Sequence, residues 1–207
     1  MSLTFYTNPM SRGRMVRWML EEVGQPYETV VLDYATTMKH EPYRGINPMG
    51  KVPAIVHDGR IVTECAAICT YLADAFPGAG LAPSLDDRAD YYRWMFFAAG
   101  PVEHAVTNKS LGVVPNEQQQ RMAGYGTFDL TIETLTKALT VNPYFAGQSF
   151  SAVDVYAGSQ ILWGMRFGSI PKNAVFEDYA SRVTSRAAYV RAAEIDDALI
   201  DAATEAA

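Results

Sequence analysis

The chain has 207 residues, of which 49% are apolar and 19% are charged, a composition typical of a globular protein with one large or two small domains. Its formal net charge of −6 argues against nucleic acid as the main partner, because phosphate backbones are normally bound by basic surfaces. The chain has no apolar run near the roughly 18 residues of a membrane-spanning helix, and its first residues lack a signal-peptide pattern.

The beginning of the chain predicts a strand, a helix and a second strand. Leu3 to Thr7 is rich in β-forming residues and ends at the turn Asn8-Pro9. Apolar residues then recur with a 3.6-residue period up to Gly24, which predicts an amphipathic helix. Tyr27 to Leu32 predicts the second strand. This order is typical of a βαβ unit with parallel strands, which binds ligands near the carboxyl ends of its strands.

The segment from Asn47 to Thr70, NPMGKVPAIVHDGRIVTECAAICT, predicts a hairpin followed by a helix. Asp58-Gly59 is the expected two-residue link, because a type I′ turn needs positive φ at both central positions. Pro53 cannot donate to a sheet ladder, so we expect it on an edge strand, at a strand start, with a cis bond accessible before it.

An edge strand that begins at Val52 would leave its N–H and C=O available to an extended peptide laid alongside. The N–H groups at the start of the helix that contains Glu64 offer a site for a carboxylate. These two features, a few residues apart, predict a pocket for a small acidic peptide. The alternative is a hairpin and a helix with a structural role only.

After Phe76-Pro77 the β signal fades and helices are expected. Residues 78–86, which open with GAGLAPSL, predict a linker between a domain at residues 1–77 and a helical domain at residues 87–207. Helices are expected from Asp86 or Asp87 to about Ala105, Glu117 to Leu139, Ser151 to Phe167, Val175 to Ala187, and Ala188 to Ala203. Ser151 and Asp154 have capping-box spacing at the start of the third of these helices.

The cysteines and histidines indicate neither a disulfide framework nor a metal site. Cys65 and Cys69 lie four residues apart in one predicted helix, as intracellular thiols would, which favours a reducing, cytoplasmic setting. His40, His57 and His104 are scattered without the spacing of metal ligands, so no metal is expected.

Several runs of the sequence resemble one family in the same order along nearly the whole chain. FYTNPMSRGRMVRWMLEEVGQPYE, NPMGKVPAIV and the step from Glu64 to Ile68 resemble the thioredoxin-like half of cytosolic glutathione transferases. YYRWMFFAAGP and FSAVDVYAGSQ resemble their helical half, particularly in bacterial, serine-type members. The resemblance implies an α/β plus all-α fold, in which a thioredoxin-like βαβ-ββα domain precedes an all-helical domain. It also implies a homodimer, with Met49 at the interface.

The function that the resemblance implies is glutathione transfer. Such an enzyme activates the thiolate of glutathione, its co-substrate, for attack on a small, apolar electrophile, commonly in detoxification. The same thiolate site is compatible with a glutathione-dependent isomerase, a disulfide reductase or a dehalogenase. A non-catalytic glutathione-binding protein of the same fold is a further alternative.

The resemblance also implies how glutathione is bound. Val52, before a cis Pro53, would pair with the cysteinyl backbone, while Glu64 and Cys65 would hold the γ-glutamyl end. Cys65 stands where the family commonly has a serine, and a thiol is a poor substitute for a hydroxyl donor. Cys65 could instead be redox-active, because thiol pKa values fall at helix N-termini.

Three cationic residues are candidates for the glycyl carboxylate of glutathione. Lys39 and His40 precede the Asn-Pro turn at a register where some family members hold this group, and Lys51 immediately precedes Val52. The alternative for each is a solvated side chain in a loop.

Ser11 is the expected catalytic residue, since it lies where serine-type members keep an activating hydroxyl. A hydroxyl that donates to the sulfur stabilises the thiolate, whose thiol otherwise has a pKa near 8.5. Asn8 and Tyr6 are the competing donors, and Ser11 could instead serve only as a helix cap.

Overall fold

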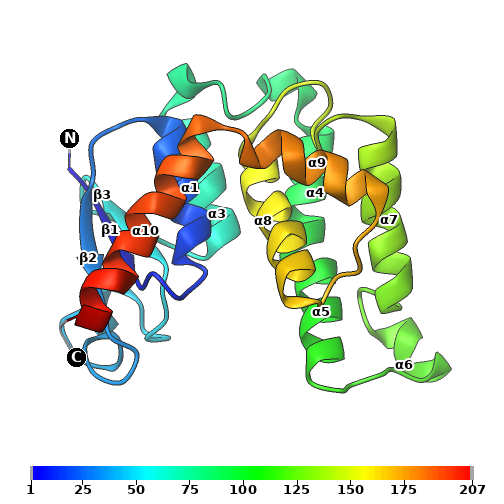
Figure 1. Ribbon diagram of the computed structural model, residues 1–207, viewed down its shortest axis with the longest axis horizontal. Coiled ribbons are helices and arrows are strands. Elements are labelled where there is room, and N and C mark those ends of the chain that lie inside the picture. The colour runs from blue at the N-terminus through cyan, green and yellow to red at the C-terminus, as the bar shows by residue number, and fades with distance from the viewer. Residues whose placement is uncertain (1, 206–207) are drawn as a thin grey trace. The chain divides into compact units, whose positions relative to one another are not determined.

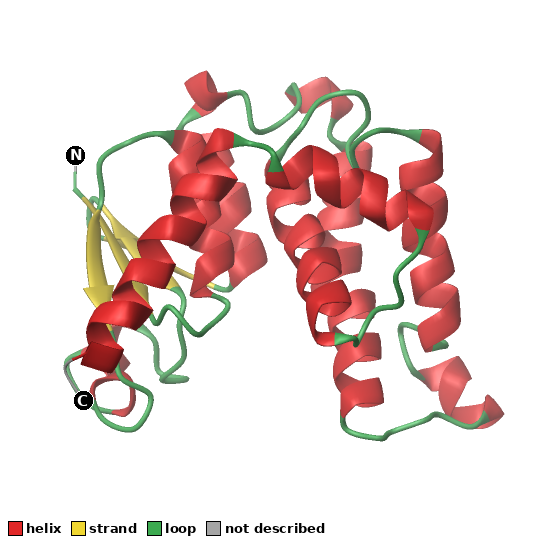
Figure 2. Ribbon diagram, viewed as in Figure 1, coloured by secondary structure: helices red, strands yellow, loops and turns green. Residues whose placement is uncertain are grey.

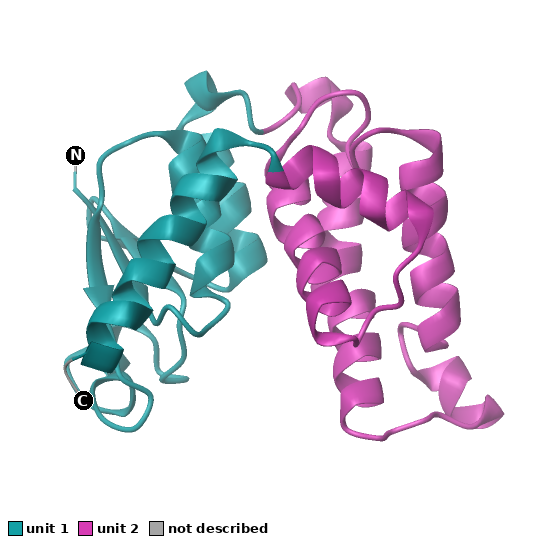
Figure 3. Cartoon of the chain, in the orientation of Figure 1, with its two compact units in different colours: residues 1–81, 185–207 teal, residues 82–184 magenta. Residues whose placement is uncertain are grey.

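The computed structural model describes residues 2–205, and the chain divides into two compact units (Figure 3). Unit 1 contains Met1–Leu81 and Ser185–Ala207, and unit 2 contains Ala82–Thr184. The sequence predicts domains that are continuous in the chain, at residues 1–77 and 87–207 with a linker at 78–86. The contacts instead assign the segment Ser185–Ala207 to unit 1.

Unit 1 is built on a mixed sheet of four strands in the order β2-β1-β3-β4. Figure 2 draws the strands in yellow. The strands are β1 (Leu3–Thr7), β2 (Glu28–Val31), β3 (Ala54–His57) and β4 (Arg60–Thr63). β1 runs parallel to β2 and antiparallel to β3, and β3 runs antiparallel to β4. The predicted βαβ unit is therefore confirmed.

Helix α1 (Gly13–Val23) connects β1 to β2 and packs against both α3 (Cys65–Ala75) and α10 (Ala187–Glu205). Figure 1 shows α10, the last helix of the chain, alongside α1. Gly24 ends α1 in the left-handed conformation at φ 69°, as its sequence position predicts. The connection from β2 to β3 contains the short helices η1 (Thr37–Lys39) and α2 (Tyr43–Ile46), and η2 (Pro77–Ala79) follows α3.

The hairpin differs from its prediction in one respect. Asp58 and Gly59 have φ of 46° and 79°, so the expected turn chemistry is confirmed. The expectation of an edge strand at Val52 is wrong, because β3 lies between β1 and β4 in the sheet. Pro53 is tolerated because it precedes Ala54, the first residue of β3, and the ladder needs no N–H from it.

Unit 2 is helical. It contains η3 (Leu85–Asp87), α4 (Ala89–Phe97), the π-helical segment η4 (Ala98–Val102), α5 (Glu103–Ser110), α6 (Glu117–Met122), α7 (Phe128–Val141), α8 (Ala152–Phe167) and α9 (Ala174–Thr184). The single helix expected from Glu117 to Leu139 is wrong, since α6 and α7 are separate. The chain turns at Gly126, where φ is 66°, and the Thr127 side chain caps α7 by accepting from the Leu130 N–H.

Helix α8 begins with the predicted capping box and is buried over most of its length. Ser151 N–H donates to Asp154 Oδ2 at 2.9 Å, and Phe145 N–H donates to Asp154 Oδ1 at 3.0 Å. Within residues 2–205, no helix combines the length and apolarity needed to cross a membrane.

Candidate functional site

The backbone of Val52 is the first part of the candidate site. Tyr43 Oη and Asn47 Nδ2 donate to the carbonyl of Lys51 at 2.6 and 2.7 Å, which fixes the peptide just before Val52. The next peptide bond, to the buried Pro53, is cis. Within residues 2–205, no hydrogen bond joins the N–H or C=O of Val52 to another residue. These groups are therefore available to an extended peptide, even though β3 is not an edge strand.

Sequence reasoning missed Tyr43 and Asn47 as the residues that orient this peptide. Burial raises the pKa of Tyr43 to about 12, so its phenol stays protonated and donates at neutral pH. Asn47 also accepts from the Met49 N–H through its side chain at 3.1 Å, in the manner of an Asx turn. The Asn47-Pro48 turn signal in the sequence could have pointed to this role.

The N-terminus of α3 is the second part of the candidate site. Glu64 is the N-cap residue, with φ of 68°, and its exposed side chain makes no capping hydrogen bond. Thr63, the residue before it, is the last residue of β4. A positive φ is uncommon outside glycine, and such conformations concentrate at binding sites. The first N–H groups of α3 offer an anion site beside this residue.

Cys65 joins the beginnings of α3 and α1. Its thiol is buried and donates to the Arg12 carbonyl, with Sγ and O 3.7 Å apart. Neither Cys65 nor Cys69 forms a disulfide. Burial raises the pKa of the Cys69 thiol well above its usual value, so Cys69 is a packing residue.

Ser11 lies at the start of α1, where its hydroxyl is engaged in a local turn. Its Oγ donates to the Asn8 carbonyl at 2.7 Å and accepts from the Gly13 N–H at 2.9 Å. The side chain of Ser11 is mostly buried, with 9% of the residue surface exposed. The hydroxyl can therefore donate to a sulfur only if its proton turns away from the Asn8 carbonyl, by rotation about the Cβ–Oγ bond.

The two competing donors make other contacts in unit 1. Asn8 Nδ2 donates to the Leu32 carbonyl at 2.9 Å, and Asn8 Oδ1 accepts from the Met10 N–H at 2.9 Å. The ring of Tyr6 packs 5.5 Å from that of Tyr43, against a buried cluster that also supports Val52. Asn8 therefore stabilises the turn, and the half-buried Tyr6 packs against the same apolar cluster as Val52.

The three candidate cations, on either side of the Asn47-Pro48 turn in the sequence, all have exposed side chains. Lys39 Nζ donates to the Gly50 carbonyl at 2.5 Å, so its ammonium lies against the loop that precedes Lys51. The side chains of His40 and Lys51 extend into solvent. The contact of Lys39 brings positive charge beside the Val52 segment. In the described part of the chain, no group of His, Cys, Asp and Glu side chains is arranged to hold a metal ion.

A mixed βαβ-ββα sheet that carries a proline before its third strand, joined to an all-helical unit, defines a thioredoxin-like α/β plus all-α protein. Residues 10–75 match the model of the glutathione S-transferase N-terminal domain. Glutathione S-transferase 3 of Schizosaccharomyces pombe is 31% identical over 163 residues, which are 70% of this chain and 66% of that protein, just under two thirds of its length.

Two further comparisons agree. Glutathione S-transferase hmp2 of Hypomyces subiculosus is 29% identical over 169 residues, covering 75% of this chain and 79% of that protein. A sphingomonad glutathione S-transferase, solved in complex with glutathione, is 27% identical with a TM-score of 0.76 and covers 94% of this chain and 98% of its own. The chain belongs to the glutathione S-transferase family.

Proposed function

We propose that this protein is a glutathione transferase, which activates the thiol of glutathione for attack on a small, apolar electrophile. The observation that carries the proposal is the Val52 peptide, whose N–H and C=O have no partner in residues 2–205 and are held by the bonds to the Lys51 carbonyl. The transferase names of the relatives favour this reaction over isomerisation, disulfide reduction or dehalogenation.

Glutathione binds in this proposal as an extended peptide beside Val52. Its cysteinyl N–H and C=O pair with the C=O and N–H of Val52, as an added strand would. Its γ-glutamyl carboxylate accepts from the first N–H groups of α3, and Glu64 pairs with the γ-glutamyl ammonium. The missing hydroxyl at Cys65 leaves the backbone N–H there as the donor.

The glycyl carboxylate lies near the cations of the preceding loop in this proposal. Lys39 already contacts the Gly50 carbonyl, so its ammonium reaches the loop from which Val52 extends. Lys51 and His40 have exposed side chains that can turn toward the same carboxylate. Because these groups stay solvated, each one contributes modestly, by about 1 kcal/mol or less.

Ser11 activates the thiol in this proposal. The thiol loses its proton to solvent, the Ser11 hydroxyl turns its own proton from the Asn8 carbonyl to donate to the sulfur anion, and the positive end of the α1 dipole adds to the effect. The sulfur lone pair then forms the carbon–sulfur bond, while the electrophile's leaving group departs with its bonding electron pair or, for an activated double bond, the π pair moves to the adjoining acceptor group and takes a proton from solvent. Each unit by which the thiol pKa falls corresponds to about 1.4 kcal/mol.

Replacement of Ser11 by alanine tests the proposal. We expect the pKa of bound glutathione, measured from the pH dependence of conjugation to a general electrophile, to rise by about one to two units. Ser11→Thr keeps the hydroxyl and serves as the matched control. An unchanged pKa and rate in Ser11→Ala would reject the role of Ser11. Calorimetry that detects glutathione binding, beside assays without turnover for several electrophiles, would instead favour a binding protein.

We also propose that the protein acts as a homodimer in the cytoplasm, in detoxification. Met49 has 69% of its surface exposed on the loop before Val52, and on unit 2 Phe96 and Val141 have 70% and 71% exposed. Single exposed apolar side chains are normal on a monomer, so the ground for the proposal is the family resemblance, which implies a homodimer with Met49 at its interface. Met49→Asp should therefore sediment as a monomer, and a variant with the sedimentation of the natural protein would exclude Met49 from the interface.

A further inference from the structure

A buried cluster of charges joins α1 to the C-terminal helix α10, and the proposed mechanism makes no use of it. Arg17 and Asp196 each have only 1% of their surface exposed, and Arg17 Nε donates to Asp196 Oδ1 at 3.2 Å. Arg14, one turn earlier on α1, places its Nε 4.0 Å from Asp196 Oδ2 and donates through Nη2 to Asp197. Two arginines of α1 therefore converge on two adjacent aspartates of α10.

The cluster also connects α1 to the sheet. Arg17 Nη1 donates to Tyr27 Oη at 3.0 Å and to Thr29 Oγ1 at 2.8 Å, just before and within β2. The guanidinium lies 4.9 Å from the centre of the Phe5 ring in β1. Arg17 is thus surrounded by the sheet on one side and by α10 on the other, so any displacement of α1 would disturb these contacts.

Ser11 lies immediately before this same helix. Arg14 and Arg17 follow it by three and six residues, about 5 and 9 Å along a helix that rises 1.5 Å per residue. Gly13 lies between Ser11 and Arg14. It packs so tightly on β1 that a Cβ at this position would lie 2.0 Å from Thr7 Oγ1 and 2.9 Å from Ser11 Oγ. The position of Ser11 is therefore coupled to the position of α1 as a rigid element.

We propose that Asp196, assisted by Asp197, is a positioning residue for thiol activation, because it fixes Arg17 and Arg14 and thereby the end of α1 that carries Ser11. The inference rests on the proposed role of Ser11. Without the aspartate, the buried guanidinium of Arg17 has no counter-ion, and α1 can restore its hydration only by moving outward. Such a movement displaces Ser11 from the Val52 and Glu64 groups that bind glutathione.

The expected direction separates positioning from a simple effect of charge. Loss of the negative charge of Asp196 would leave more positive charge near the thiolate, which by itself lowers the thiol pKa. Loss of positioning weakens the hydrogen bond from Ser11 and raises the thiol pKa. The sign of the change in pKa therefore identifies which effect dominates.

The experiment compares Asp196→Asn with Glu22→Gln in the full-length protein. Glu22, near the other end of α1, accepts from Arg186 of the same C-terminal segment at 2.7 Å through both carboxylate oxygens. Glu22→Gln therefore weakens the same helix pair far from Ser11. We expect Asp196→Asn to raise the pKa of bound glutathione by about one unit and to lower kcat/KM below that pKa about tenfold. In Glu22→Gln both values should stay unchanged.

Asp197→Asn keeps the test valid if Asp196→Asn does not fold. Asp197 has 62% of its side chain exposed and, among residues 2–205, pairs with Arg14 alone, so this variant should fold and change the pKa in the same direction by a smaller amount. Two results in the aspartate variants that fold would overturn the inference. One is a lower thiol pKa than in the natural protein, and the other is a thiol pKa and kcat/KM equal to those of Glu22→Gln.

Ser11→Ala, measured in the same series, separates the two proposals. If Ser11→Ala shifts the thiol pKa and Asp196→Asn does not, only the positioning role fails. If Ser11→Ala has the natural pKa, the role of Ser11 fails and the positioning inference falls with it.

Discussion

Among single residues, Gly13 has the least room for a side chain, because it packs directly against Thr7. A methyl group at Gly13 would overlap Thr7 Oγ1, at 2.0 Å, and the Thr7 side chain is fully buried and cannot retreat. We expect Gly13→Ala to lower the free energy of unfolding by about 1–3 kcal/mol, as overpacking does. Urea denaturation at neutral pH measures this change.

The control for Gly13→Ala is Gly78→Ala. A Cβ at Gly78 has no atom within 4 Å, and its backbone conformation is open to any residue, so its unfolding free energy should change little. Equal stability of the two variants would contradict the close packing of α1 on β1.

Ser11 illustrates what single-residue reasoning can and cannot supply. Its candidacy comes from the family resemblance, because Ser11 follows the Asn8-Pro9 turn at the place where serine-type members keep an activating hydroxyl. The engagement of its hydroxyl with the Asn8 carbonyl depends on a side-chain rotamer, which only the structure specifies. The same holds for Cys65, whose thiol points to a backbone carbonyl of another helix.

At the scale of elements, the start of α8 depends on one buried carboxyl group. Asp154 is fully buried and accepts from the N–H groups of Phe145 and Ser151 and from the hydroxyls of Ser151 and Tyr179. Burial raises the pKa of Asp154 from 3.8 to about 6, against the opposing effect of these hydrogen bonds. The folded state therefore binds a proton at Asp154 more tightly than the unfolded state does.

The sign of the resulting pH dependence follows from linkage. Because the pKa of Asp154 is higher in the folded state, this group's contribution to stability is complete below about pH 4 and is lost as the pH rises through about 6, a difference of about 3 kcal/mol. The difference in unfolding free energy between the natural protein and Asp154→Asn should therefore decrease across this range. Parallel stability curves for the two proteins would contradict the raised pKa.

Averaged over this pH range, Asp154→Asn should also have a lower free energy of unfolding than the natural protein. An amide offers one acceptor where the carboxylate offers two, and its NH₂ group would face the N–H of Ser151. Leaving a buried donor without an acceptor costs about 1–3 kcal/mol. Denaturation at several pH values measures this offset together with the slope.

Two elements were wrongly predicted because their patterns are compatible with more than one structure. The apolar stripe from Glu117 to Leu139 continues through the break between α6 and α7, and Tyr125 is buried there although it is not helical. Pro53 suggested an edge strand, but a proline just before a strand leaves the ladder intact even at the centre of a sheet.

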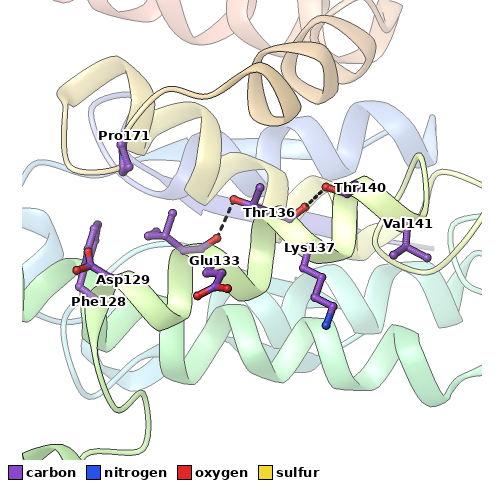
Figure 4. A pocket seen from close by; sticks show the side chains of 9 residues that line it. Phe128, Asp129, Glu133, Thr136, Lys137, Thr140, Val141 and Pro171 are labelled. Carbon is purple, nitrogen blue, oxygen red and sulfur yellow. Dashed lines mark hydrogen bonds between the residues drawn. The ribbon is translucent and has the colours of Figure 1, made fainter.

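A groove lies along helix α7 of unit 2. Figure 4 shows the side chains that line it, mainly from α7, with Pro171 opposite. Its volume is about 780 Å³, and Ile132 and Phe128 form its apolar wall. Asp129, Glu133 and Lys137 place both signs of charge along its margin, so the lining selects no single ligand charge.

At the scale of the whole molecule, the C-terminal helix completes unit 1. Besides the Arg17–Asp196 pair, the rings of Trp18 and Tyr189 meet edge to face at 5.0 Å, and Arg186 pairs with Glu22. These contacts join segments more than 160 residues apart in the chain. The packing of unit 1 is therefore complete only when α10 is in place against α1.

A chain that ends at Thr184 tests this dependence. Removal of α10 exposes Trp18 and leaves the Arg17 guanidinium without its anion, which costs about 3–5 kcal/mol for the lost ion-pair partner alone. We expect the amides of β1, α1 and β3 to lose protection from hydrogen exchange, while those of α7 and α8 keep it. Natural protection throughout β1 and α1 would contradict the role of α10.

Local sequence patterns were enough to predict the four strands β1 to β4, helices α1 and α3, the turn at Asp58-Gly59, the α8 capping box and the order of motifs that indicates the family, but not the short helix α2. Periodicity, turn chemistry and capping act over a few residues and are therefore legible in the chain. Three features follow only from the three-dimensional packing: β3 lies inside the sheet, the hydroxyl of Ser11 donates to the Asn8 carbonyl, and Asp196 pairs with Arg17, 179 residues away in the chain. Such pairings depend on packing between distant segments, which no local pattern specifies.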